Sequence, residues 1–295
     1  MLNLRNLIFV VICSLLFSCD TQKKGEEAGS NKAPESLVGT WKLKQRVNQR
    51  VGSEPEWLTA SDTMIYNKNL TETHFTWIQY DKNNDILQGI GGGTYDYDGS
   101  RYVEHIAFFM PLESGILGQS INFTADFKDG EWYHAGYTKE IEFDPELAQM
   151  VVVDSNKIEE IWQKIETTPE SNDLVGTWEL KELKQQPDED FFSYPDFINY
   201  KKLITPSHFV WIQYNDDGDE VTGAGSGTYS YNGKEYREQI QMIYPTGNNI
   251  LGSQITFNCD VEGNRWNHFA SSILQDGVET DSIYIDEIWA KIGSM

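Results

Sequence analysis

The sequence has little cysteine, and what it has argues against a fold held together by disulfide bonds. Only three cysteines occur among 295 residues, at positions 13, 19 and 259. Cys13 and Cys19 lie in an N-terminal segment that we expect to be processed, so Cys259 has no intrachain partner. In the internal repeat described below, Cys259 corresponds to Ala125, which favours a small buried residue over a nucleophile.

Basic residues are also few. The chain has 23 Lys and Arg against 46 Asp and Glu, which gives a formal net charge of −23 at pH 7. Phosphate backbones and anionic lipid headgroups repel such a surface, and no basic stripe offsets it. We therefore expect no nucleic-acid partner.

Long apolar runs are missing except at the N-terminus. Residues 7–17 are apolar, follow Arg5 and precede Ser18, a pattern typical of an export signal and too short for a membrane-spanning helix. Leu16-Phe-Ser-Cys19 resembles a bacterial lipobox, although an ordinary secretory signal with an incidental cysteine is the alternative. The resemblance implies that residues 1–18 are a lipoprotein signal peptide and that Cys19 carries the lipid, such as palmitate. It also implies a lipid-anchored protein of the bacterial cell envelope, on the outer membrane.

What the sequence does have is an internal repeat. Leu37-Val-Gly-Thr-Trp41 returns as Leu174-Val-Gly-Thr-Trp178, and further matches follow at an offset of 134. The last matching pair, around Trp162 and Trp289, is offset by 127, so copy one has seven extra residues before it. We expect domains at 37–165 and 174–292, a linker at 166–173, and a flexible polar tether at 19–36.

Each copy reads as a set of short strands. In Tyr236-Arg-Glu-Gln-Ile-Gln-Met242, polar residues alternate with mostly apolar ones, as in a strand with one face exposed to solvent. Clusters of Asn, Asp and Gly separate such runs. Asp144-Pro-Glu-Leu-Ala-Gln149 is the best candidate for a short helical turn. The sequence therefore predicts an all-β protein with two tandem antiparallel up-and-down β-barrels.

The repeated motifs carry a resemblance. Gly39-Thr-Trp41 and Gly176-Thr-Trp178 are similar to the Gly-x-Trp opening of lipocalins. With His-Phe-x-Trp, Gly-Thr-Tyr and the closing Glu-x-Trp, both copies resemble lipocalin-like domains of bacterial envelope proteins. The resemblance implies that Trp41 and Trp178 each close one barrel end, with Lys164 and Lys291 packed on them.

Several duplicated polar residues are expected to point into the barrels, because they share strand faces with apolar residues. These candidates for a ligand pocket are His74, Glu104, His134, Glu160, His208, Glu238, His268 and Glu287. A buried carboxylate needs a compensating partner. An internal hydrogen-bond network, a pocket for the polar head of a small molecule, and a metal or general acid–base site are the three explanations. No metal-ligand spacing supports the third, so we expect no metal, cofactor or catalysis.

Two functional classes remain. The first is a membrane-anchored binding protein whose barrels hold a small, partly apolar ligand or a segment of an envelope protein. The alternative is a non-catalytic interaction or structural lipoprotein with filled barrels and an acidic working surface. Cavity size discriminates between them, because an eight-stranded barrel is either filled by side chains or wide enough for one small ligand.

Overall fold

The computed structural model describes residues 36–50, 54–112, 115–165, 172–247, 250–270, 273–275, 278–281 and 284–293. The predicted signal peptide, Cys19, nearly all of the tether and most of the linker lie outside the described residues. Within them no helix is long and apolar enough to cross a membrane.

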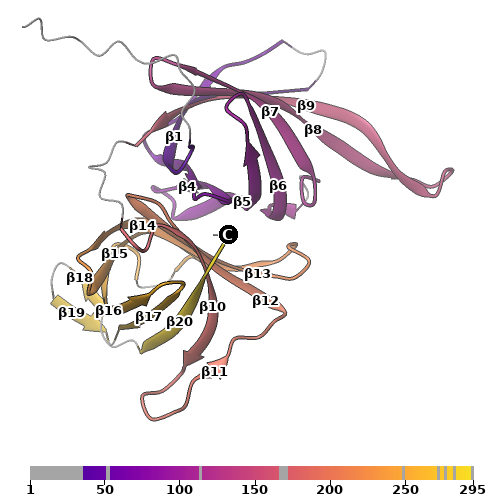
Figure 1. The fold of residues 1–295 in the computed structure, drawn as a ribbon. Coiled ribbons are helices and arrows are strands. Elements are labelled where there is room, and N and C mark those ends of the chain that lie inside the picture. Colours follow the sequence, from indigo (N-terminus) through magenta and orange to yellow (C-terminus); the bar gives the residue numbers. More distant parts are fainter. Residues whose placement is uncertain are drawn as a thin grey trace, which may run out of the picture.

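The first copy forms a closed antiparallel barrel, which we call barrel 1 (Figure 1). Its strands are β1 (Gly39–Arg50), β2 (Leu58–Thr59), β3 (Met64–Leu70), β4 (His74–Asp81), β5 (Ile86–Tyr97), β6 (Arg101–Met110), β7 (Ser120–Lys128), β8 (Glu131–Asp144) and β9 (Gln149–Lys164). They pair in chain order, except that the short β2 lies on the edge of β1. Pairing of β1 with β9 closes the barrel.

The second copy, barrel 2, repeats this plan. Its strands are β10 (Gly176–Lys184), β11 (Phe192–Ser193), β12 (Ile198–Ile204), β13 (His208–Asn215), β14 (Val221–Tyr231), β15 (Glu235–Tyr244), β16 (Gln254–Glu262), β17 (Arg265–Ala270), β18 (Ile273–Gln275), β19 (Val278–Asp281) and β20 (Ile285–Ile292). Pairing of β10 with β20 and of β15 with β16 closes it. The prediction of an all-β fold with two tandem antiparallel barrels is confirmed.

The longest departure from the repeat is the β8–β9 hairpin, which extends away from barrel 1 (Figure 1). The predicted helical turn at Asp144–Gln149 is wrong, because these residues form the hairpin turn. Asp144 accepts hydrogen bonds from the backbone N–H groups of Glu146 and Leu147, an Asx turn that competes with helix formation.

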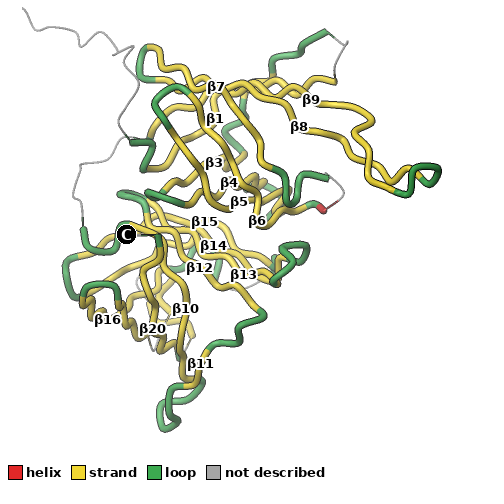
Figure 2. The backbone as a smooth tube through the Cα atoms, turned by 45° about the vertical axis from the view of Figure 1, so that its right-hand side comes forward, coloured by secondary structure: helices red, strands yellow, loops and turns green. Residues whose placement is uncertain are grey.

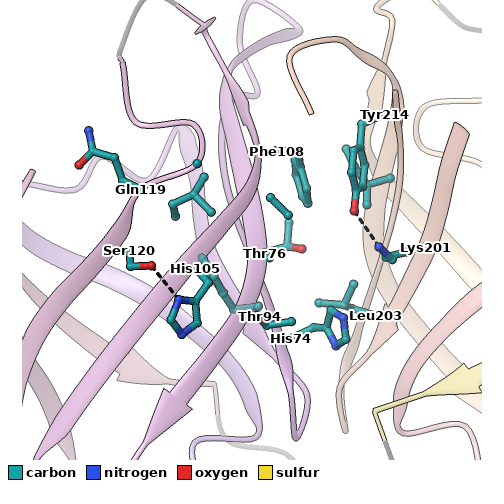
Figure 3. A pocket seen from close by; sticks show the side chains of 16 residues that line it. His74, Thr76, Thr94, His105, Phe108, Gln119, Ser120, Lys201, Leu203 and Tyr214 are labelled. Atoms are coloured by element: carbon teal, nitrogen blue, oxygen red, sulfur yellow. Dashed lines mark hydrogen bonds between the residues drawn. The ribbon is translucent and has the colours of Figure 1, made fainter. Parts of the chain in front are cut away.

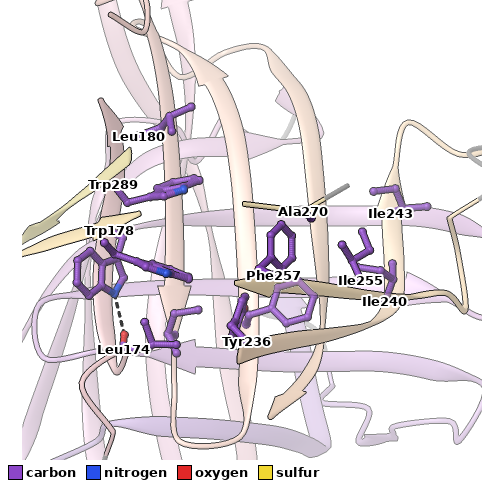
Figure 4. Close-up of a cluster of buried hydrophobic side chains, with 13 residues drawn as sticks. Leu174, Trp178, Leu180, Tyr236, Ile240, Ile243, Ile255, Phe257, Ala270 and Trp289 are labelled. Carbon is purple, nitrogen blue, oxygen red and sulfur yellow. Dashed lines mark hydrogen bonds between the residues drawn. The ribbon is translucent and has the colours of Figure 1, made fainter. Parts of the chain in front are cut away.

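Aromatic side chains fill the interior of both barrels. In barrel 2, Trp178, Trp266 and Trp289 are fully buried and pack with Tyr236 and Phe257 (Figure 4). Barrel 1 has the same arrangement around its own buried tryptophans. Burial of these large rings, together with their edge-to-face contacts, makes them the principal apolar contribution to each core.

The glycine-rich start of β5 serves this packing. A Cβ at Gly91 would lie 2.8 Å from the Trp77 indole nitrogen, and one at Gly93 would lie 1.9 Å from the His105 carbonyl oxygen. The strand register also shifts between Gly92 and Gly93. The run therefore allows the strand to bend and pack closely in the barrel wall.

The two barrels pack against each other through outward strand faces, chiefly of β4–β6 and β12–β15, and we call this contact the seam (Figure 2). Its buried apolar residues are Ile78, Tyr80, Leu87, Ile90, Phe108, Val210, Ile212, Tyr214, Val221, Ala224 and Met242. Ten of them form equivalent pairs across the repeat, such as Ile78 with Ile212, whereas Val210 corresponds to Thr76.

Two buried hydroxyl pairs show that the seam has pseudo-twofold symmetry. Thr40 bonds Thr205 at 2.8 Å, and Thr71 bonds Thr177 at 2.7 Å. Since Thr40 corresponds to Thr177 and Thr71 to Thr205, the two bonds are symmetry equivalents. The seam thus has the self-complementary geometry of an isologous dimer interface, built within one chain.

Candidate functional site

A layer of charged and polar side chains crosses the middle of each barrel. In barrel 1 it consists of Lys68 on β3, Glu104 on β6, His134 on β8, and Glu160 and Trp162 on β9. Strand alternation places all five side chains on inward faces. We call this set the inner network.

The buried cation is central to the inner network. Lys68 Nζ lies 2.7 Å from Glu104 Oε1 and 3.9 Å from Glu160 Oε2, and it lies 4.9 Å from the Trp162 ring centroid. Lys68 and Glu104 are each less than 5% exposed. A carboxylate buried so deeply is tolerated only when paired, and Lys68 is the partner that the sequence analysis left unnamed.

The imidazole and the second carboxylate complete the network. His134 Nε2 lies 2.5 Å from Glu160 Oε2, and the Trp162 indole N–H donates to the same oxygen at 3.0 Å. The plane of His134 stacks on Phe123 at 4.4 Å between ring centroids. His134 Nδ1 has no hydrogen-bond partner among the described residues, which suits an unprotonated nitrogen in an apolar contact.

These contacts fix the charge states. Burial lowers the pKa of His134, and the charge of Lys68 lowers it further, so the imidazole is neutral at pH 7 and donates from Nε2. Burial by itself raises the pKa of Glu160, but the hydrogen bond from His134 and the charges around it bring the pKa down to about 2. The network is thus a Lys⁺ between two carboxylates, with one of them held by neutral donors.

Barrel 2 repeats the inner network with Lys202, Glu238, His268, Glu287 and Trp289. The Lys202–Glu238 distance is 3.0 Å, and His268 Nε2 lies 2.6 Å from Glu287 Oε2. Burial lowers the pKa of His268, and the pKa of Glu287 is again below its usual range because hydrogen bonds and charges outweigh burial.

The network favours the first of the three explanations for the duplicated polar residues. Each carboxylate has a cation or N–H donors, so neither requires a ligand to be stable in the barrel. Within the described residues, no group of three or more His, Cys, Asp or Glu side chains is placed to hold a metal ion.

Each barrel has its predicted Trp–Lys pair where its first strand begins. Lys164 Nζ lies 5.5 Å from the ring centroid of Trp41, and Lys291 Nζ lies 5.3 Å from that of Trp178. The Trp41 indole N–H also donates to the Leu37 carbonyl at 2.9 Å. The structure brings each predicted pair together as a cation–π contact.

His74 and His208 lie elsewhere, and the expectation that they point into the barrels is wrong. In β4, Phe75 and Trp77 belong to the core of barrel 1, whereas Ile78 and Tyr80 belong to the seam. The period of two places His74 with Ile78 and Tyr80, on the outward face. Burial lowers the pKa of both imidazoles to about 4.

Barrel 1 has a cavity of about 180 Å³ between its inner network and the end opposite Trp41. Lys68, Glu104, Glu160 and Trp162 lie at its base. Its walls and rim are formed by Arg46, Val47, Tyr66, Trp77, Gln79, Ile106, Phe109, Ile116, Ile121, Phe123 and Ile158. Arg46 is partly exposed and lies 5.3 Å from the Tyr66 ring centroid, so it marks the mouth.

Barrel 2 differs at the corresponding place. Tyr194 packs on Tyr200 with 5.7 Å between ring centroids and is part of the barrel 2 core. Matching hydrogen bonds from Ala60 and Tyr194 to the first strand of each barrel show that the two residues are equivalent. By strand register Arg46 corresponds to Leu183. Barrel 2 therefore has an aromatic ring where barrel 1 has the methyl group of Ala60.

Sequence reasoning missed Lys68, Lys202 and Arg46. A signal for the lysines existed, because Tyr66 and Lys68 recur as Tyr200 and Lys202 at the offset of 134 and share one strand face. Arg46 is not repeated, so a search for duplicated residues passes over it. Cys259, expected to be buried, is partly exposed, accepts a hydrogen bond from the Trp266 indole, and has a pKa raised by burial to about 11, which disfavours a thiolate nucleophile.

No family model and no curated protein matches this chain. Three solved structures are similar over most of it. An uncharacterised protein of Saccharomyces cerevisiae has 9% identity and a TM-score of 0.43, covering 86% of this chain and 98% of that one. A protein of unknown function from Nostoc punctiforme has 10% identity and a TM-score of 0.23, with 87% and 96% covered. A Trp-to-Ala mutant of transferrin binding protein B from Haemophilus parasuis has 6% identity and a TM-score of 0.22, with 90% and 78% covered. Scores this low carry no argument about function.

Proposed function

We propose that this protein is a lipid-anchored binding protein of the bacterial envelope whose first barrel holds a small, partly apolar molecule. The observation that carries the proposal is the cavity of barrel 1, with its apolar walls and the guanidinium of Arg46 at its mouth. The N-terminal signal and Cys19 supply the anchor in this proposal, and barrel 2 serves as a filled companion domain.

The size of the cavity limits the ligand. An apolar protein cavity of about 150 Å³ can hold benzene, whereas drug-sized ligands need roughly 300 Å³ or more. The cavity of about 180 Å³ therefore suits a single ring or a short chain. Trp77 and Phe109 contact the apolar body, and Arg46 favours an oxygen acceptor or a negative charge at the exposed end.

The chain provides a matched pair of variants for the test. Arg46→Leu/Ala60→Tyr gives barrel 1 the residues of barrel 2 and should fill the cavity. Leu183→Arg/Tyr194→Ala makes the reverse change in barrel 2. Native mass spectrometry of the protein purified from its own host should find a small bound mass on the wild type and lose it in the first variant only. An empty wild-type protein, or a bound mass retained in the first variant, would contradict the proposal.

The anchor needs its own test. Cys19→Ser should release the protein from the membrane fraction, and continued membrane association of this variant would argue against a lipid on Cys19.

A second candidate is an interaction lipoprotein that acts through its outer surface. The observation in its favour is Trp57, which is 48% exposed beside Leu58 and stands where the second copy has Phe191. Retention of an envelope protein by the wild type, and its loss in Trp57→Ser with the cavity intact, would favour this candidate.

A further inference from the structure

The seam contains a second cavity, of about 220 Å³, that none of the functions considered so far uses (Figure 3). Barrel 1 contributes strands β4–β6 and the start of β7, and barrel 2 contributes β12 and β13. Phe108, Leu203 and Ile212 form its apolar walls. The cavity is thus open to a ligand that contacts both barrels at once.

Three of the polar residues on its lining, Lys201, Tyr214 and Thr76, have a hydrogen-bond donor that is unused within the described residues. Lys201 Nζ donates to Tyr214 Oη at 2.8 Å and to Asn199 Oδ1 at 3.2 Å, which leaves one of its three N–H groups without a described acceptor. Because Tyr214 Oη accepts from Lys201, its own hydrogen is directed elsewhere. Figure 3 draws the Thr76 hydroxyl pointing toward the strands that carry Lys201 and Tyr214.

Thr76 is the most informative of these groups. It is completely buried, and its hydroxyl has no hydrogen-bond partner among the described residues. A buried hydroxyl without a partner is destabilising, so its presence calls for an explanation. A ligand oxygen in the cavity would supply the missing bond.

The polar groups also break the pseudo-twofold symmetry of the seam. Thr76 corresponds to Val210, His105 to Gln239, and Lys201 to Asn67. Apart from Val210, the apolar seam residues have equivalents in both copies. The polar residues therefore make one side of an otherwise symmetric interface different from the other.

The charges around the cavity select the ligand. Lys201 lies opposite Glu179 in the strand ladder, and the Glu179 carboxylate bonds Lys181. His105 Nε2 lies 2.9 Å from Asp96 Oδ2. His74, also on the lining, is neutral at pH 7 because burial and Lys201 lower its pKa to about 4. One cation and two hydroxyl donors in a strongly acidic protein match a single negative charge better than a phosphate dianion.

We propose that the seam cavity binds a small organic monocarboxylate, with Lys201 and the hydroxyls of Thr76 and Tyr214 on the carboxylate and Phe108 and Leu203 against its apolar body. The site is distinct from the cavity of barrel 1, and its existence does not depend on the function proposed for that barrel.

The test is a calorimetric titration of the purified full-length protein with sodium benzoate. Lys201→Asn and Thr76→Val install the residues found at the equivalent positions of the other barrel. Saturable binding is expected for the wild type, with a loss of about tenfold to a hundredfold in Lys201→Asn, because a hydrogen bond to a charged group is removed. Thr76→Val should weaken binding about threefold to tenfold.

Thr76→Val also tests whether weaker binding is caused by a folding defect. It is nearly isosteric and removes a hydroxyl that has no partner in the free protein, so the melting temperature should be unchanged or raised while binding weakens. Arg46→Leu/Ala60→Tyr, which should fill the barrel 1 cavity, separates the two sites, because benzoate binding that remains in this variant belongs to the seam. The proposal is overturned if millimolar benzoate shows no saturable binding, if filling barrel 1 abolishes all of it, or if neither seam variant affects it.

Discussion

Barrel 1 and barrel 2 agree in their middle layers and differ at the ends opposite Trp41 and Trp178. The Lys–Glu and His–Glu contacts of the inner networks match to within a few tenths of an ångström. At the far end, Arg46 lines the cavity of barrel 1, and barrel 2 has Leu183 and Tyr194 where barrel 1 has Arg46 and Ala60. Repetition therefore marks the scaffold of this protein, and divergence marks the candidate binding surfaces.

The seam shows the same relation between repeated and unmatched residues. Its repeated residues, such as Tyr80 and Tyr214, pack the two barrels together. Its unmatched residues, such as Thr76 and Lys201, line the second cavity. After duplication, one copy can change a residue while the other copy keeps the original packing. Each cavity therefore lies where the residues of the two copies differ.

The largest expected effect concerns the inner networks. Lys68→Met should lower the free energy of unfolding by about 3–5 kcal/mol, because it leaves Glu104 buried without its cation. Lys202→Met should do the same in barrel 2, as urea unfolding followed by tryptophan fluorescence would show. The double variant Lys68→Met/Glu104→Leu should recover much of the loss. If one single variant lost less than about 1 kcal/mol of unfolding free energy while the other behaved as predicted, the two networks would not contribute equally to stability.

Acidification should affect both networks in the same direction. The pKa of Glu160 is about 2 in the folded protein against an ordinary value of 4.5, so its contribution is complete above pH 4.5 and is lost as the pH falls toward 2. The lowered pKa values of His134 and His268 add a loss that begins below pH 6.5, because the folded state disfavours the imidazolium.

Urea titrations at a series of pH values test this. Below pH 4.5 the free energy of unfolding should fall less steeply with pH in Glu160→Gln, because barrel 1 then loses most of its pH dependence. Glu287→Gln should have the same effect through barrel 2. Unchanged slopes in both variants would show that the carboxylates are not held as described.

Much of this fold can be predicted from the sequence, for a physical reason. Strand alternation and turn residues report local backbone geometry, and the repeat shows which residues both barrels need. The seam is harder to predict, because Phe75 and Trp77 on one face of β4 and Ile78 and Tyr80 on the other make it apolar on both sides. That pattern is typical of a strand that is buried on both faces. Since the second face packs on another domain, periodicity within one copy does not identify what covers it.

The site shows a second limit. Duplicated Glu and His residues indicated an internal network, but the cation that stabilises it lies on β3, where Lys68 is surrounded by polar neighbours. Ala60 of barrel 1 is a small residue whose significance appears only beside its counterpart Tyr194. An empty volume depends on side chains from several strands, so no single segment of sequence predicts it.

The next effect concerns the seam. Gly218 has a φ of +75°, and a Cβ on it would lie 1.9 Å from the Ala107 carbonyl oxygen of barrel 1. Gly218→Ala should lower stability by about 1–3 kcal/mol through overpacking, and it should loosen the contact between barrels. Gly233→Ala is the matched control, because Gly233 also has a positive φ of +90° but has nothing within 4 Å of such a Cβ.

Amide hydrogen exchange would separate the two variants of this pair. Gly218→Ala should expose seam amides of β4 and β13 that Gly233→Ala leaves protected. Equal losses of stability with equal protection would mean that backbone strain alone, and not contact between the barrels, makes glycine necessary at position 218.

The smallest effect is expected in the β8–β9 hairpin, where the copies differ most in length. Val152 and Val153 are 56% and 49% exposed, and the hairpin projects from the barrel, so these side chains contribute little apolar burial (Figure 1). Val152→Thr/Val153→Thr should change the free energy of unfolding by no more than about 0.5 kcal/mol, because exposed positions outside packed or capped sites tolerate substitution. The melting temperature measures this directly. A substantially larger loss would show that the hairpin is covered, by a second copy or by another part of the chain, and would make this extension a third place where divergence of barrel 1 from barrel 2 marks a binding surface.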